Sequence, residues 1–203
     1  MDPTVGVPDG GHPAGLVAVR ELAKGTGTTI IHNLITSRAV PEIVREHGGV
    51  PVRTRVGHSF IKAEMARTDA VFGGEHSVHY YFRDFWRADT GMLAAMHVLV
   101  ALGEQSRPLS ELTSGYERYV ASGEINSTVT DSAGRVAAVR ESYGLLDGVG
   151  FDELDGLTVS LPDGAWFNLR ASNTEPLLRL NVEAPDAARM AEVRDEVLGM
   201  VRA

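Results

Sequence analysis

The stretch 28–56, TTIIHNLITSRAVPEIVREHGGVPVRTRV, sets the fold of the amino-terminal half. It begins with TTIIH, whose β-branched and apolar side chains predict a buried strand. Residues 37–47 (SRAVPEIVREH) predict a helix that ends at the glycine pair 48–49. Residues 50–56 (VPVRTRV) alternate apolar and polar side chains, which is typical of a half-exposed strand. A strand, a helix and a second strand in this order predict a βαβ unit with parallel strands.

Elements of the same kind lie on both sides of this unit. Further helices are expected over residues 14–24, 59–67, 90–102 and 108–120, and a short strand is expected over residues 69–72 (DAVF). Residues 14–105 are therefore predicted to form a three-layer α/β/α domain with a mainly parallel sheet. Residues 106–120 are predicted to be a connecting helix, and the Gly- and Pro-rich residues 1–13 an extended lead-in.

The carboxyl-terminal half has a different pattern. Strands are expected over residues 124–129, 157–161, 165–170 and 177–182, with helices over 131–143 and from 186 onward. The turn sequence Pro162-Asp163-Gly164 between two alternating runs predicts a β-hairpin. The glycines of residues 144–156 predict a loop. Residues 121–203 are thus expected to form a small α+β domain with a four-stranded antiparallel sheet and two helices.

Composition excludes several classes of protein. Of the 203 residues, 43% are apolar, so disorder is not expected. The absence of cysteine excludes disulfides and thiolate metal sites. The net charge of −8 argues against a nucleic-acid partner. No apolar run approaches the ~20 residues that span a bilayer, and the first residues do not resemble a signal peptide. We therefore expect a soluble, cytoplasmic protein without a membrane partner.

The densest polar cluster is Arg170-Ala171-Ser172-Asn173-Thr174, between two predicted strands. A guanidinium, two hydroxyls, a carboxamide and backbone N–H groups can together satisfy the terminal oxygens of a phosphate. The alternative is an ordinary polar turn, in which Ser and Asn bond to their own backbone. The residue types alone favour the turn.

A second polar cluster, Gly73-Gly74-Glu75-His76-Ser77-Val78-His79, follows the predicted strand 69–72. Ligands of α/β sheets bind at the carboxyl ends of strands, and a carboxylate beside a hydroxyl suits a hydroxyl-rich ligand such as a sugar. Glu75 and Ser77 are the candidates for these contacts. A metal site of Glu75, His76 and His79 is a weak alternative, because the spacing lacks the H-E-x-x-H order. A capped turn with exposed histidines is the commoner arrangement.

A third cluster, Gly57-His58-Ser59, lies between a predicted strand and a helix. Capping of that helix by His58 or Ser59 is the simpler role. The cluster also opens from a strand's carboxyl end, so His58 and Glu75 are expected at the same edge of the sheet. Asp84 and Asp89 have no spacing that indicates acid/base chemistry, and we expect both to be solvated.

Together, GEHSVH at 74–79, GHS at 57–59 and RASNTEPLLRL at 170–180 resemble motifs of the α-D-phosphohexomutases, the phosphomannomutase/phosphoglucomutase family. The resemblance extends from about residue 14 to the carboxyl end. It implies that the hexose is bound by Glu75, Ser77, His58 and His79. It also implies that the phosphate that is not being transferred is held by Arg170, Ser172, Asn173 and Thr174. Val78 departs from the family, which usually has a smaller residue there.

Two family motifs have no counterpart in this sequence. The phosphoserine loop T-A-S-H-N-P and the metal loop D-G-D-x-D-R belong to the first and second of four domains in the family, and neither is present. The resemblance therefore implies domains three and four, with no catalytic residue and no metal ligand in this chain. The Mg²⁺ of the full-length family would be held by the missing loop.

The implied parent reaction moves a phosphoryl group between C1 and C6 of a hexose through the phosphoserine and a bisphosphate. The implied partners are a hexose phosphate, such as mannose or glucose 1- or 6-phosphate, and the missing amino-terminal domains. The alternatives are a non-catalytic phosphosugar-binding or regulatory module and a structural remnant without activity. If Glu75 only contacts sugar, its replacement by Gln is expected to leave thermal stability nearly unchanged.

Overall fold

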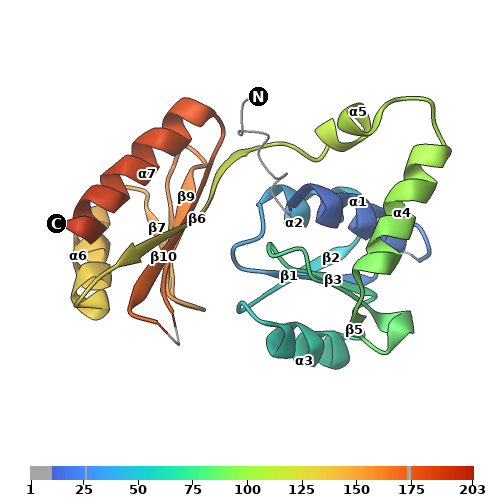
Figure 1. The fold of residues 1–203 in the computed structure, drawn as a ribbon, viewed down its shortest axis with the longest axis horizontal. Helices are drawn as coiled ribbons and strands as arrows, with labels where there is room; N and C mark the ends of the chain where they lie inside the picture. The colour runs from blue at the N-terminus through green and yellow to red at the C-terminus, as the bar shows by residue number, and fades with distance from the viewer. Residues whose placement is uncertain (1–10, 26, 173–174) are drawn as a thin grey trace. The chain divides into compact units, whose positions relative to one another are not determined.

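The computed structural model describes residues 11–25, 27–172 and 175–203. They form two compact units that divide between Arg118 and Tyr119 (Figure 1). The helices of the first unit are α1 (Gly11–Leu22), α2 (Ala39–Glu46), α3 (His58–Thr68), α4 (Gly91–Gly103) and α5 (Leu109–Ser114), with a short 3₁₀ turn at Arg83–Phe85. Its strands are β1 (Thr29–Asn33), β2 (Val50–Thr54), β3 (Phe72–Gly74), β4 (Tyr80–Phe82) and β5 (Ala88–Asp89).

The sheet of the first unit is mixed, with strand order β2-β1-β3-β4-β5. β1 pairs in parallel with β2 and β3, as the βαβ pattern predicts. The remaining two pairings, β3 with β4 and β4 with β5, are antiparallel, so the prediction of a mainly parallel sheet is wrong. Residues 75–79 join β3 to β4 and are too few for the crossover of a dozen or more residues that a parallel pair needs.

Helices cover both faces of this sheet, with α1, α2 and α4 on one side and α3 on the other (Figure 1). Successive residues of a strand point to opposite faces, and two neighbours in β1 show the consequence. Ile30 packs in the cluster that includes α1, α2 and α4, whereas Ile31 packs with Ile61 and Met65 of α3. Because β1 carries apolar side chains on both faces, helices must cover both faces of the sheet, which gives the three-layer arrangement.

The short strand β3 lies two to three residues later in the chain than the sequence pattern predicts. Gly73 and Gly74 belong to the strand and not to a turn after it. A Cβ on Gly73 would lie 2.8 Å from Cγ2 of Ile61 and 3.1 Å from Sδ of Met65. Glycine is therefore needed here because α3 packs directly on the strand, and the turn begins only at Glu75.

The bounds of the flanking helices also differ from the prediction. α1 begins at Gly11, so part of the predicted lead-in is helical, and Pro13 fits because first-turn N–H groups have no helical partner. The helix expected over 108–120 is the six-residue α5, and the next strand already begins at Val120. The described residues contain no helix long and apolar enough to cross a membrane.

The second unit is an antiparallel sheet with two helices. Its elements are β6 (Val120–Thr128), α6 (Ser132–Gly144), β7 (Gly150–Asp152), β8 (Leu157–Ser160), β9 (Trp166–Ala171), β10 (Leu177–Ala184) and α7 (Ala187–Arg202). The strand order is β6-β10-β9-β8-β7, so the sheet has five strands where four were predicted. β7 was missed because this edge strand is three residues long, exposed and begins with glycine. The predicted hairpin across residues 162–164 is the β8–β9 connection.

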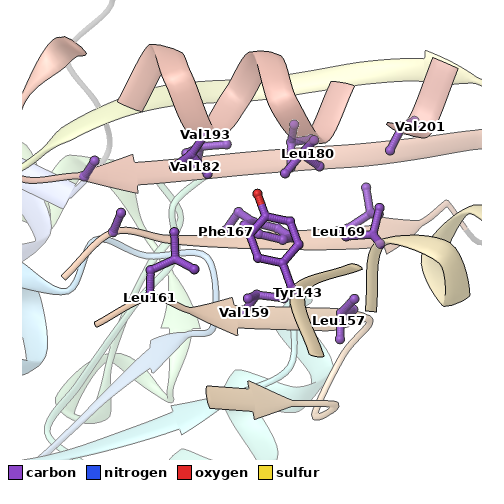
Figure 2. Packing of buried hydrophobic residues seen from close by; sticks show 14 of the residues in the cluster. Tyr143, Leu157, Val159, Leu161, Phe167, Leu169, Leu180, Val182, Val193 and Val201 are labelled. Atoms are coloured by element: carbon purple, nitrogen blue, oxygen red, sulfur yellow. The ribbon is translucent and has the colours of Figure 1, made fainter. Parts of the chain in front are cut away.

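One face of this sheet forms the core of the unit. Leu180 and Val182 of β10 and Leu169 of β9 point toward α6 and α7 (Figure 2). The ring of Tyr143 in α6 meets the ring of Phe167 edge-on, with centroids 5.0 Å apart. Because side chains alternate along a strand, the residues between these apolar positions face away from the helices. The opposite face is polar, and the predicted phosphate-binding arginine lies on it.

Candidate functional site

The carboxylate of Glu75 connects three other segments at the edge of the sheet where β1, β2 and β3 end. Its Oε1 accepts a hydrogen bond from the hydroxyl of Tyr81 in β4 at 2.7 Å. Its Oε2 accepts from Nδ2 of Asn33 at the end of β1, at 3.3 Å. The same oxygen accepts from the backbone N–H of Gly57, which precedes α3, at 3.2 Å. Glu75 itself is only 2% exposed.

These bonds give Glu75 a structural role that its sequence motif did not reveal. A buried carboxylate is tolerated when hydrogen-bond donors surround it, and three donors do so here. The bond to Gly57 fixes the start of the segment that presents His58. Glu75 thus positions the GHS segment relative to the 75–79 loop, and its replacement is expected to lower stability, contrary to the expectation for a residue that only contacts sugar.

The other three predicted sugar-binding residues are exposed. His58 is the first residue of α3, Ser77 lies in the 75–79 loop, and His79 precedes β4. Nδ1 of His79 lies 2.6 Å from Oδ2 of Asp89, whose other oxygen accepts from the N–H of Tyr80 at 2.9 Å. Asp89 is therefore a structural partner of His79 and not merely a solvated carboxylate. Asp84 is exposed and pairs with Arg83.

Val78 adopts a left-handed backbone conformation, with φ of 61°. Its N–H donates to the carbonyl oxygen of Glu75 at 3.1 Å, which closes a turn, and the N–H of Glu75 donates to the carbonyl of His79 at 3.0 Å. A β-branched residue in this conformation costs roughly 1–2 kcal/mol. The turn therefore places Val78 in a conformation that a β-branched residue rarely adopts.

The geometry does not support the metal alternative for this loop. Glu75 is engaged by Asn33, Gly57 and Tyr81, while His79 faces Asp89. Within the described parts of the chain, no group of three or more His, Asp or Glu side chains is placed to hold a metal ion. Buried His32, in β1, is neutral at physiological pH, because desolvation lowers its pKa to about 4.

Arg170 lies near the end of β9, on the polar face of the second unit's sheet. It is directly opposite Arg179 of β10. Both arginines approach one carboxylate, that of Glu124 in β6: Nη1 of Arg179 donates to Oε1 at 3.1 Å, and Nη2 of Arg170 lies 3.8 Å from Oε2. The Nε atoms of both arginines are buried and have no partner among the described residues. We call Arg170 and Arg179 the arginine pair.

Two of the four predicted phosphate-binding residues, Asn173 and Thr174, lie outside the described residues. The N–H of Ser172 donates to the carbonyl of Leu177 at 2.8 Å, which closes the base of the connection between β9 and β10. The N–H of Leu177 donates to Glu175 at 2.8 Å. The ends of the connection are thus fixed by the strands, and Arg170 projects from the regular part of the sheet.

Sequence reasoning missed four residues that complete these two clusters. Asn33 and Tyr81 belong to strands, where their polar groups look like ordinary strand residues. Glu124 and Arg179 lie 55 residues apart in the sequence, and only the strand register places them together. One signal was available in the sequence of β10, where apolar and polar side chains alternate. Arg179 lies between the core residues Leu178 and Leu180, so it faces away from the core and shares a face with Arg170.

Two family models match the chain. Residues 9–119 match the phosphoglucomutase/phosphomannomutase alpha/beta/alpha domain III, and residues 124–200 match the phosphoglucomutase/phosphomannomutase C-terminal domain. A phosphomannomutase of Methanocaldococcus jannaschii is 38% identical over 186 residues, which are 92% of this chain and 40% of that protein. The chain thus spans about two fifths of the length of this curated relative.

Solved structures agree with these matches. A phosphoglucomutase/phosphomannomutase family protein from Burkholderia thailandensis is 30% identical, with a TM-score of 0.79 over 94% of this chain and 41% of that one. An N-acetylphosphoglucosamine mutase from Aspergillus fumigatus, solved with GlcNAc-6P and magnesium, has a TM-score of 0.65 over 96% of this chain and 47% of that one. At 14% identity, the second likeness concerns the fold alone.

Proposed function

The chain belongs to the phosphoglucomutase/phosphomannomutase family, and we propose that it is the substrate-recognition half of a phosphohexomutase. The first unit would contact the hexose, and the second would hold the phosphate that is not being transferred. The whole enzyme would move a phosphoryl group between C1 and C6 of mannose or glucose phosphate. The phosphoserine and the metal would come from domains that this chain does not contain.

The arginine pair carries this proposal. Two arginines are direct cross-strand partners, and among the described residues both pair with one carboxylate, that of Glu124, so this cluster of three side chains has an excess of positive charge. Arginine presents a planar fork of N–H donors that fits two phosphate oxygens, and its charge is permanent. The net charge of −8 opposes any anion, but exposed charges more than about 8–10 Å away are screened at physiological ionic strength. The N–H donors of the arginine pair therefore determine whether phosphate binds.

In the first unit, the exposed side chains of Ser77, His58 and His79 are the proposed sugar contacts. A hydroxyl both donates and accepts, as sugar hydroxyls do, and an imidazole nitrogen can form a hydrogen bond with a sugar hydroxyl. Glu75 would act mainly by fixing the segments that carry them. Because Glu75 is buried, a direct contact with a sugar would require the residues that cover its carboxylate to move.

Magnesium does not fit the described residues, which lack the necessary group of carboxylates. Mg²⁺ prefers octahedral oxygen ligands, and phosphoryl transfer depends on charge stabilisation and positioning of the reacting groups. The chain's own residues would therefore bind and orient the hexose phosphate, and the transfer itself would take place on the missing domains.

We expect Arg170→Lys to weaken phosphate binding about ten-fold or more, because a point charge cannot replace the two-pronged contact. Titration of inorganic phosphate into isotope-labelled protein should shift the amide resonances of Arg170 and Ser172 before those of the first unit. Arg194→Lys, on α7, is the matched control, because Arg194 pairs with its neighbour Asp195 on the helix surface and its replacement should leave the response unchanged. An Arg170→Lys protein that binds as the wild type does would contradict the proposed site.

A further inference from the structure

The carboxylate of Glu124 lies where an anion would also have to bind. It accepts a hydrogen bond from Arg179 at 3.1 Å, and it is 3.8 Å from Arg170, which is beyond hydrogen-bond distance. The side chain of Arg170 is 13% exposed and that of Glu124 is 28% exposed. Glu124 is therefore close enough to neutralise part of the charge of the arginine pair, yet accessible enough to move.

We propose that Glu124 is a built-in counterion that holds the arginine pair in the ligand-free chain and is displaced from it when phosphate binds. This inference rests on the proposed phosphate site. It assigns Glu124 a positioning role, with no contact to phosphate of its own.

The register of the sheet explains why a counterion is needed. Arg170 and Arg179 are direct cross-strand partners, and like charges in this relation destabilise a sheet. Their buried Nε atoms have no partner among the described residues. Without Glu124, the two guanidinium groups would lose the one carboxylate that pairs with both of them among the described residues. The carboxylate of Glu124 attracts both guanidinium groups. It therefore holds the two arginine side chains together on one side of β10.

The net charge of this site determines how tightly it binds phosphate. Two arginines and one glutamate leave a single positive charge, and a phosphate dianion turns this into a single negative charge. In Glu124→Gln the same site would begin with two positive charges and become neutral on binding. The variant should therefore bind phosphate more tightly, and its ligand-free form should be less stable. In the wild type, the returning carboxylate would favour the release of phosphate.

The test is the phosphate titration of Glu124→Gln in the full chain. We expect binding about three- to ten-fold tighter than in the wild type, together with a lower melting temperature without phosphate. Glu124→Asp keeps the charge and should show no gain in affinity. Glu192→Gln removes a charge from α7, where Glu192 pairs with Arg189, and serves as the control for net charge.

The outcomes separate the two proposals. If phosphate binding depends on Arg170 but Glu124→Gln binds equally or more weakly, the counterion role is wrong and the phosphate site stands. A gain in Glu124→Asp as large as in Glu124→Gln would also overturn the role, because the charge is retained there. If no phosphate binds to the wild type or to any variant, both proposals fail.

Discussion

Glu75→Ala is expected to destabilise the first unit by about 3–5 kcal/mol, since it removes the acceptor of three hydrogen bonds and each buried donor left unpaired costs about 1–3 kcal/mol. The donors are the Tyr81 hydroxyl, the Asn33 carboxamide and the Gly57 N–H. Urea unfolding followed by far-ultraviolet circular dichroism measures this loss. Glu75→Gln should lose roughly half as much, because its amide keeps one acceptor oxygen.

The matched control for Glu75→Ala is Glu64→Ala. Glu64 lies on α3 and forms an exposed i,i+3 pair with Arg67, so its removal should cost at most about 0.5 kcal/mol. If Glu75→Ala unfolded at the same urea concentration as Glu64→Ala, the carboxylate would not be the link between the strand ends. The three hydrogen bonds of Glu75 would then add no more to the free energy of unfolding than the hydrogen bonds that water makes with an exposed carboxylate.

Gly156→Ala is expected to cost the second unit about 2–4 kcal/mol, from a strained backbone and from overpacking. Gly156 has φ of 72°, and an added Cβ would lie 2.6 Å from the carbonyl oxygen of Leu169 and 2.9 Å from Cα of Arg170. These are backbone atoms of β9 and cannot move aside cheaply. Because the clash falls on Arg170, the variant should also weaken phosphate binding.

Trp166 reports this unfolding, since it is buried in β9 and its indole N–H donates to Glu183 at 2.8 Å. Gly123→Ala is the control within the same unit: Gly123 has φ of 68°, but a Cβ there meets nothing within 4 Å. It isolates the backbone strain, which we expect to be about 1 kcal/mol. If both variants lost the same free energy of unfolding, the backbone at Leu169 and Arg170 would accommodate the added Cβ without destabilising the unit.

The sequence predicted elements that carry a strong local signal. The helices α2, α3, α6 and α7, the buried strand β1 and the β8–β9 hairpin follow from periodicity, caps and one Pro-Asp-Gly turn. The missed strands β4, β5 and β7 have two or three residues each, too few to show a period. Their pairing depends on loop length and tertiary packing. For that reason the parallel character of the first sheet was overestimated.

The candidate site was predictable in its motifs but not in its connections. The donors around Arg170 alone favoured an ordinary polar turn, and its proposed phosphate role came from the resemblance of residues 170–180 to a family motif. Glu124 and Arg179 could not be found, because cross-strand register is a property of the folded sheet. Glu75 was assigned to ligand contact from its position after a strand, and its burial among donors emerged only from the geometry.

One measurement tests most directly the claim that this chain recognises hexose phosphates without transferring their phosphoryl group. Mannose 1-phosphate is added with Mg²⁺ to the labelled chain, and amide resonances and sugar phosphates are followed in the same sample. We expect shifts at Arg170 and Ser172 and also at His58, Ser77 and His79, with no formation of mannose 6-phosphate. Inorganic phosphate should shift the resonances of Arg170 and Ser172 but not those of His58, Ser77 and His79. Turnover above a heat-inactivated control, or the absence of shifts in both units, would contradict the account.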